Sequence, residues 1–166
     1  MDPTQAGFLA FIRTVMGIEV QYLPDDAPVI AITYNIAISL VNQGIKLFGT
    51  CPGVDPNQPS LYAFAVYNLA ADRLITWAPD QVGVVYKTVD GQEYGYFAWI
   101  RKQFNSNGFT PGVIQSTNDL STGGTFVVPE AFKYFTIRDL QNTKTPYGVA
   151  YLEIAMDWGP NDWGIS

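Results

Sequence analysis

The chain has 166 residues, the length of one ordinary domain. It contains no histidine and one cysteine, Cys51, which excludes histidine-based catalysis, an internal disulfide and a thiolate metal cluster. The net charge of −6 argues against a protein that clamps nucleic-acid phosphates. Only 14% of the residues are charged, against about 25% in an average globular protein, so the surface is weakly protected against self-association. We therefore expect a subunit with much of its surface covered by partners.

We expect neither a secretion signal nor a membrane span in this sequence. An acidic residue, Asp2, stands where a signal peptide carries a basic one. The longest apolar stretch, 29–41, is interrupted by three polar residues and is too short to cross a bilayer. We expect a protein made in a reducing cytoplasm, without a membrane partner.

The first predicted element is a helix near the N-terminus. Asp2 is expected to cap it, Pro3 suits its first position and Gly17 suits its end. Four apolar residues recur on one face: Phe8, Phe11, Ile12 and Val15. This spacing predicts an amphipathic helix with that face in the core.

A second helix is expected after the turn 23–28, with Asp25 or Asp26 as its cap. No charged residue occurs from Ala27 to Ile45. Three residues form its one polar stripe: Asn35, Ser39 and Asn42. A helix that is apolar on most sides is typical of a central, sandwiched position. Its β-branched residues would also suit strands.

A third helix is predicted over 60–77 and should stop at Ala78-Pro79-Asp80. Its core positions repeat at helical spacing: Ala63, Val66, Tyr67, Ala70, Leu74 and Trp77. Three polar residues are expected to face outward: Asn68, Asp72 and Arg73. Both Trp77 and Trp99 are interpreted as core residues.

The segment 82–97 combines two signals. Asp90-Gly91 between apolar runs is typical of a two-residue hairpin, while apolar residues from Tyr94 onward recur at helical spacing. We expect a short extended insertion followed by a helix over 92–104. The residues that come next, 113–128, have no helical periodicity and predict a hairpin or extended arm with strands at 113–115 and 125–128, joined by 121–124.

The end of the chain is predicted to hold one more helix and an aromatic tail. Thr145-Pro146 should cap a helix that runs to about Met156. The tail 157–166 is expected to be non-helical, and its tryptophans have nothing local to pack on. Aromatic anchors of this kind are favoured at interfaces. Docking on a partner and folding back on the same subunit are equally open for Trp158 and Trp163.

Candidate catalytic groups are few. Asp25-Asp26 is better explained by helix capping than by a catalytic pair, and Cys51 is better explained as a bystander thiol. Three acidic residues could gather around a cation, but surface solvation is the better interpretation: Glu153, Asp157 and Asp162. We therefore predict no enzyme and no catalytic, cofactor-binding or metal-binding residue.

The predicted elements follow a recognisable order along the chain. Helical segments come first, then a Gly/Ser/Thr-rich arm (113–125), then Asp139-Leu140, and finally Thr145-Pro146-Tyr147-Gly148 at the start of a last helix. This order resembles the head–tail connector (adaptor) proteins of tailed bacteriophages, whose pattern is a helical bundle, a Ser-rich arm and a T-x-Y-G start to a short C-terminal helix. The insertion around 82–96 is a departure from that pattern.

The resemblance implies a mainly α fold: a bundle of four to five helices with a small β hairpin or extended arm (113–128) before a short C-terminal helix, all in one domain over 1–166. It implies a structural subunit of a homo-oligomeric ring of about twelve copies. The ring would stack under the portal in the virion neck, extend the DNA channel without binding DNA specifically, and offer a platform to the next neck or tail protein.

On this interpretation, functional residues form surfaces. The arm residues expected at the subunit interface are Thr117, Asn118, Asp119, Leu120, Ser121, Thr122 and Thr125. The residues expected to dock on the portal or the next ring are Trp158, Trp163 and Ile165.

Two alternatives remain open. A tail-terminator or minor capsid-associated structural protein would have more β structure, with 29–41 and 82–89 as strands. A small soluble binding module would have an aromatic pocket built by four residues: Tyr94, Tyr96, Trp99 and Phe109.

Overall fold

The computed structural model describes residues 2–48, 60–105, 116–119, 122–125, 142 and 144–158. The helices in these ranges are α1 (Gln5–Thr14), α2 (Pro28–Leu40), α3 (Ile45–Phe48), α4 (Leu61–Trp77), α5 (Tyr96–Asn105) and α7 (Pro146–Trp158). Two antiparallel hairpins join β1 (Lys87–Val89) to β2 (Gln92–Tyr94) and β3 (Ser116–Asp119) to β4 (Thr122–Thr125). The mainly α fold with a small β hairpin before a short final helix is confirmed.

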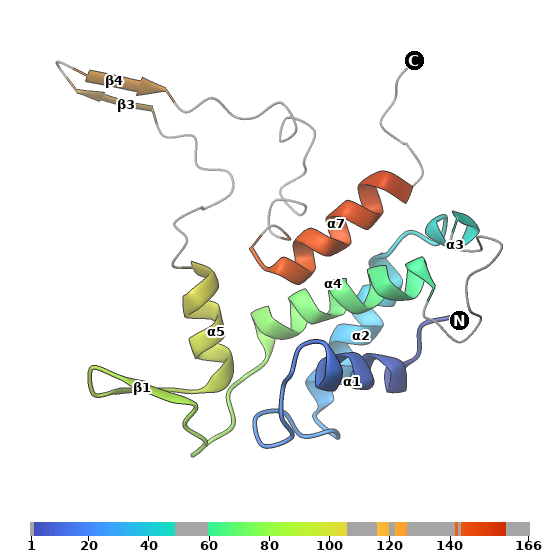
Figure 1. The fold of residues 1–166 in the computed structure, drawn as a ribbon, viewed down its shortest axis with the longest axis horizontal. Coiled ribbons are helices and arrows are strands. Elements are labelled where there is room, and N and C mark those ends of the chain that lie inside the picture. The colour runs from blue at the N-terminus through green and yellow to red at the C-terminus, as the bar shows by residue number, and fades with distance from the viewer. Residues whose placement is uncertain are drawn as a thin grey trace.

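Helix α4 is the centre of the molecule. It runs between α7 on one side and α1 and α2 on the other, with α5 at its C-terminal end (Figure 1). Almost every residue from Tyr62 to Ile75 is buried, and several of them are alanines, which let neighbouring helices approach closely. The expected core residues of this helix are buried except Trp77, which is 48% exposed in its last turn.

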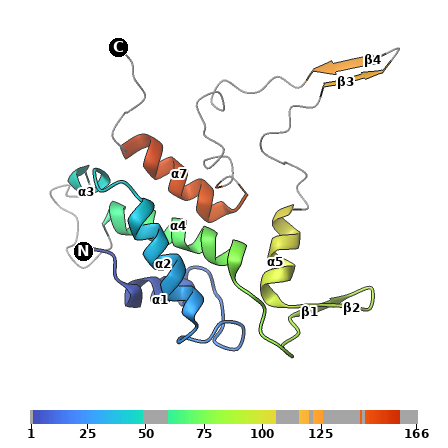
Figure 2. The same ribbon diagram turned by 180° about the vertical axis from the view of Figure 1, so that it is seen from behind.

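Helix α2 does not occupy the central position that its composition predicted. It lies on the surface of the body, in front of α4 in Figure 2. Its inner side, with Ile30, Tyr34 and Ala37, packs into the core, while Ile32 on the other side is half exposed. The prediction was wrong because apolar composition does not determine how many neighbouring elements are present to cover a helix.

The predicted caps of the first two helices were also wrong. Thr4, not Asp2, caps α1, because its hydroxyl oxygen accepts the backbone N–H of Gly7 at 3.0 Å. Helix α1 ends at Thr14, before the expected Gly17, and Val15 is exposed instead of buried. Neither Asp25 nor Asp26 caps α2, whose first residues follow Ala27 without a side-chain cap.

Asp25 instead forms an ion pair with Arg13 of α1. The same guanidinium donates to the carbonyl oxygens of Ile18 and Leu23, at 2.6 Å each. These bonds hold the loop between α1 and α2 against the end of α1. Hydrogen bonds to a charged donor are stronger than neutral ones, so this loop is tied firmly to the helix.

The Asp90-Gly91 turn links β1 and β2 as predicted. Both residues have positive φ, +51° and +78°, which is the geometry of a type I′ hairpin turn. The pairing of Lys87 with Tyr94 keeps residues 92–94 extended. Helix α5 therefore starts at Tyr96, four residues later than expected.

A reciprocal pair of contacts joins α4 to α5. The Asp80 carboxylate accepts the backbone N–H groups of Phe97 and Ala98, at 2.6 and 3.0 Å, and so caps α5 from outside the helix. Arg101 of α5 donates to the carbonyl oxygens of Ile75 and Ala78 at the end of α4, at 3.1 and 2.8 Å. Arg101 of α5 thus satisfies free carbonyl groups at the end of α4, and Asp80, three residues beyond α4, satisfies free N–H groups at the start of α5.

The hairpin β3–β4 lies within the arm predicted from the sequence, and in Figures 1 and 2 it lies apart from the helices. Its register pairs Ser116 with Thr125 and Asp119 with Thr122. The second strand thus contains residues that were expected to form the connecting loop. The runs 113–115 and 126–128, expected as strands, lie outside the described residues.

Candidate functional site

The Thr145–Gly148 motif fastens α7 to α4. The Thr145 hydroxyl donates to Asp72 Oδ1 at 2.6 Å and accepts the backbone N–H of Gly148 at 3.0 Å, so one side chain caps α7 and binds α4. Gly148 is buried against the same contact, where a Cβ atom would collide with the carbonyl oxygen of Asn142 and lie 2.8 Å from Asp72 Oδ1. The predicted cap is confirmed, and the glycine is explained by close helix packing.

Asp72 and Arg73 are buried rather than outward-facing. Asp72 is 1% exposed, and its Oδ2 lies 3.4 Å from Arg73 Nη1 without accepting a hydrogen bond from any described residue. Arg73 Nη2 donates to Asn142 Oδ1 at 2.9 Å. Burial raises the pKa of the Asp72 carboxyl, and this outweighs the lowering by the Thr145 hydrogen bond and the Arg73 charge. The cluster therefore holds α7 in place at an electrostatic cost.

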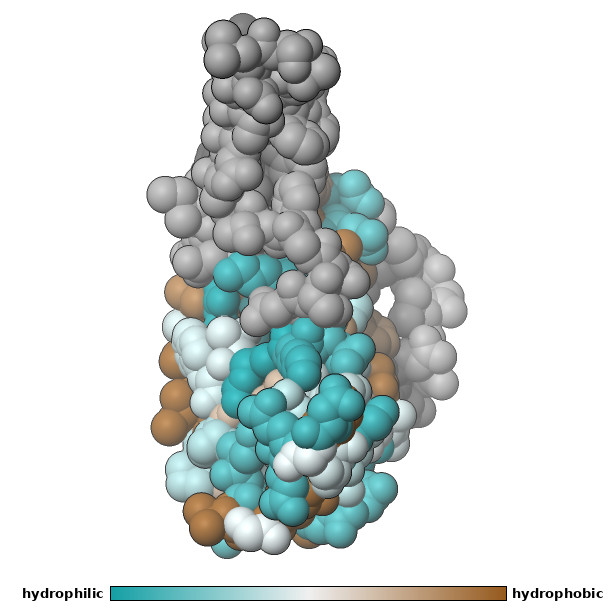
Figure 3. All heavy atoms as spheres, turned by 90° about the vertical axis from the view of Figure 1, so that its left-hand side faces the viewer, coloured by the Kyte–Doolittle hydropathy of each residue, from teal (hydrophilic) through white to brown (hydrophobic). Residues whose placement is uncertain are grey.

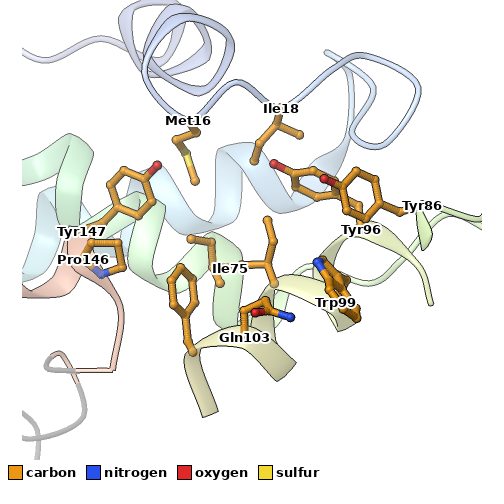
Figure 4. A pocket seen from close by; sticks show the side chains of 11 residues that line it. Met16, Ile18, Ile75, Tyr86, Tyr96, Trp99, Gln103, Pro146 and Tyr147 are labelled. Carbon is orange, nitrogen blue, oxygen red and sulfur yellow. The ribbon is translucent and has the colours of Figure 1, made fainter. Parts of the chain in front are cut away.

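A cavity of about 210 Å³ lies between the α1–α2 loop, the end of α4, α5 and the start of α7. Its walls are mostly apolar and aromatic, and the side chains point toward a common centre (Figure 4). The lining residues are Met16, Ile18, Ile75, Tyr86, Tyr96, Trp99, Ile100, Gln103, Phe104, Pro146 and Tyr147. Its size and walls suit a small apolar or aromatic group.

Stacked aromatic rings form one wall of this cavity. The Tyr96 ring is stacked on Tyr22 at 4.9 Å and meets Tyr86 edge-on at 5.0 Å. Burial, with the neighbouring tyrosines, raises the pKa of Tyr96 to about 12, so its hydroxyl stays protonated at neutral pH. The cavity thus presents the neutral hydroxyl group of Tyr96 at this wall.

Trp99 is held from the outer side by the first hairpin. Tyr94 packs edge-on against Trp99 at 5.7 Å, and Lys87 Nζ lies 4.5 Å from the Trp99 ring centre. The Lys102 ammonium donates to the Tyr94 hydroxyl at 2.7 Å. These cation–π and aromatic contacts fix the β1–β2 hairpin on α5. Trp99 is accordingly half-buried.

The structure brings only part of the predicted aromatic pocket together. Tyr96 and Trp99 line the cavity, Tyr94 lies behind Trp99, and Phe109 lies outside the described residues. The contribution of Met16 and Ile18 was missed, because the loop that follows α1 carried no pattern that pointed to a pocket.

The structure describes only some of the residues expected at interfaces. Thr117, Asn118 and Asp119 lie in β3, and Thr122 and Thr125 lie in β4. Leu120, Ser121, Trp163, Ile165 and Cys51 lie outside the described residues. Trp158 is the last residue of α7, so the helix extends into the tail that was expected to be non-helical.

No matching protein-family model, curated protein or solved structure was found for this chain. Within the described ranges, no three acidic or cysteine side chains gather closely enough to hold a metal ion. Glu153 and Asp157 are exposed on α7, and Asp162 lies beyond the described part. None of the helices described is both long and apolar enough to span a membrane.

Proposed function

We propose that this chain is a structural subunit of a bacteriophage head–tail connector ring, which stacks under the portal and extends the DNA channel toward the tail. The observation that carries the proposal is the β3–β4 hairpin, which follows α5, precedes α7 and lies apart from the helices. Such a hairpin offers backbone edges that can pair with a neighbouring subunit. The ring would contain about twelve copies.

Charge and the tail support the same proposal. A subunit with a net charge of −6 would make a channel wall that repels phosphates, so DNA would slide through without specific binding. Trp158, Trp163 and Ile165 would dock on the portal or on the next neck protein. The role is non-enzymatic, and the subunit would be made in the host cytoplasm and function in the virion neck.

The test is to replace 116–125 by an equally long Gly/Ser segment, which keeps the chain length but removes strand pairing. We expect the helical circular-dichroism signal to be unchanged, while native mass spectrometry and electron microscopy show annular particles for the unaltered chain and smaller species for the variant. Equal assembly of both proteins would exclude the arm from the interface.

The aromatic cavity favours a second candidate, a small soluble binding module. In that case the unaltered chain would be a monomer at every concentration, and replacement of the arm would leave its mass class unchanged. This outcome would overturn the connector proposal.

A further inference from the structure

The cavity between the α1–α2 loop, α5 and α7 has walls that are fixed from behind. Tyr96 is stacked on Tyr22, which lies behind it, with 4.9 Å between the ring centres. Tyr147 meets Phe11 of α1 edge-on, with ring centres 6.3 Å apart. The β1–β2 hairpin holds Trp99 through cation–π and aromatic contacts. These walls are therefore in place before a ligand enters, and binding does not have to order them.

The outer surface near the cavity differs from its lining. Where the end of the molecule with β1, β2 and α5 faces the viewer in Figure 3, its surface is largely hydrophilic. The side chains that α5 contributes to the cavity are mostly apolar and aromatic, among them Trp99, Ile100 and Phe104. An apolar hollow within a polar exterior is typical of a site for a small molecule.

The volume of the cavity sets the size of the ligand. A protein cavity of about 150 Å³ accommodates benzene, and pockets for drug-sized molecules begin at about 300 Å³. This cavity, at about 210 Å³, lies between these limits. It therefore suits a single benzene-sized ring with one small substituent.

The lining favours a flat ring. Figure 4 shows Tyr147 on one side of the cavity and Tyr96 and Trp99 on the other, with Met16 between them at a third side. Aromatic rings attract one another edge to face or offset face to face at centre distances of about 4.5–7 Å, and a thioether sulfur packs well on a ring edge. A saturated ring of the same size has neither the flat face nor the polar edge that these contacts need.

Tyrosine hydroxyls supply polar contacts in the cavity. Burial raises the pKa of Tyr147, and burial together with the neighbouring Tyr86 and Tyr147 raises the pKa of Tyr96 to about 12. The hydroxyls of Tyr96 and Tyr147 are therefore protonated at neutral pH, and each can both donate and accept a hydrogen bond. None of the described lining residues is charged, so a charged ligand would lose its hydration without gaining an opposite charge.

We propose that this cavity binds a small neutral aromatic molecule with one hydrogen-bonding substituent, for which phenol is the simplest probe. The ring of the ligand lies between Tyr147 and Trp99, and its substituent exchanges a hydrogen bond with the hydroxyl of Tyr96. The site belongs to one copy of the chain, so the inference goes beyond the proposed function and does not depend on assembly.

The test is a saturation-transfer NMR titration of the full chain with phenol, which can be read on a monomer and on an assembled ring alike. We expect saturable binding with a dissociation constant of about 1 mM or tighter. Toluene has the same ring without the hydroxyl, cyclohexanol has the hydroxyl on a saturated ring, and benzoate carries a charge. Each of these probes should bind at least about fivefold more weakly than phenol.

Variants place the binding in the cavity. Met16→Trp fills the space with an indole ring and should abolish the phenol signal, whereas Val20→Trp adds the same ring at an exposed position of the same loop and should retain it. Tyr96→Phe keeps the aromatic wall but removes the hydroxyl, so it should weaken phenol binding by about tenfold and leave toluene binding unchanged. Circular dichroism checks that each variant is folded.

Four results would overturn the inference. They are the absence of saturable phenol binding, equal phenol binding by the Met16→Trp and Val20→Trp proteins, an unchanged phenol affinity of the Tyr96→Phe protein, and binding of any other probe as tightly as phenol. A chain that assembles into rings but does not bind phenol leaves the connector proposal standing. A monomer that binds phenol leaves only this site standing.

Discussion

Helices α2 and α4 are both rich in apolar residues, and α2 is the more apolar of the two, yet α4 is the one that is buried. Helix α4 contains an acid and a base, Asp72 and Arg73, and is buried almost all round; α2 contains no charge and is half exposed. The difference lies in their neighbours, since α4 is contacted by α1, α2, α3, α5 and α7, whereas α2 packs mainly on α4 and α1. Composition states how much apolar surface a helix has, and topology decides how much of it is covered.

The largest expected loss of stability comes from a substitution that separates α7 from α4. Gly148→Val would drive a side chain into the Asn142 carbonyl and the Asp72 carboxylate, so α7 would have to leave α4. We expect a loss of more than about 4 kcal/mol in the free energy of unfolding, the range of exceptional single substitutions. Urea unfolding followed by circular dichroism measures it.

The matched control for this variant is Val149→Ala, at an exposed position one residue further along α7. It should cost about 0.5 kcal/mol or less. A Gly148→Val protein as stable as this control would show that α7 does not pack on α4 through Gly148.

A smaller effect sharpens the comparison within α2 itself. Ile30 is buried and Ile32 is half exposed on the same helix, so the pair compares one residue type in two environments. Ile30→Ala should cost about 3 kcal/mol, whereas Ile32→Ala should cost about 0.5 kcal/mol. Thermal or urea unfolding of the two variants decides the question, and equal losses would contradict the outward position of Ile32.

The smallest effect is a pH dependence from Asp72. Its pKa is raised in the folded chain, so the folded state holds this proton more tightly than the unfolded state. The contribution of Asp72 to stability is therefore present below about pH 3.9, its ordinary pKa, and is lost as the pH rises through the folded pKa.

The Asp72→Asn variant isolates this contribution. Relative to the unaltered chain, its deficit in unfolding free energy should be largest in acid and should shrink toward neutral pH, because asparagine does not titrate. The measurement is urea unfolding of both proteins over pH 3–8. Parallel stability curves would mean that Asp72 titrates normally in the folded state.

Features set by neighbours in the sequence were predictable. The Asp90-Gly91 turn and the Thr145 cap depend on local backbone conformation, and both occur where the pattern placed them. The Thr4 cap was missed because two acceptable capping residues lie two positions apart, and the sequence does not say which one starts the helix.

Features set by distant partners were not predictable. The burial of Asp72 depends on Thr145, which lies 73 residues away, and no local pattern reports that contact. The aromatic cavity likewise needs Met16, Ile75 and Tyr147 from three separate segments. The exposure of α2 was not predictable either, because an uncharged helix is compatible both with a central position and with a position at the surface.

The position of α4 also governs the order in which the chain can fold. Its contacts to Thr4 and Thr145 close loops of 63 and 73 residues, and such long closures slow folding because their entropy is lost before the contacts form. Helix α7 follows the other described helices in the chain, so α4 keeps an apolar side open until α7 arrives. A chain at that stage exposes on α4 an apolar surface that the folded chain buries under α7.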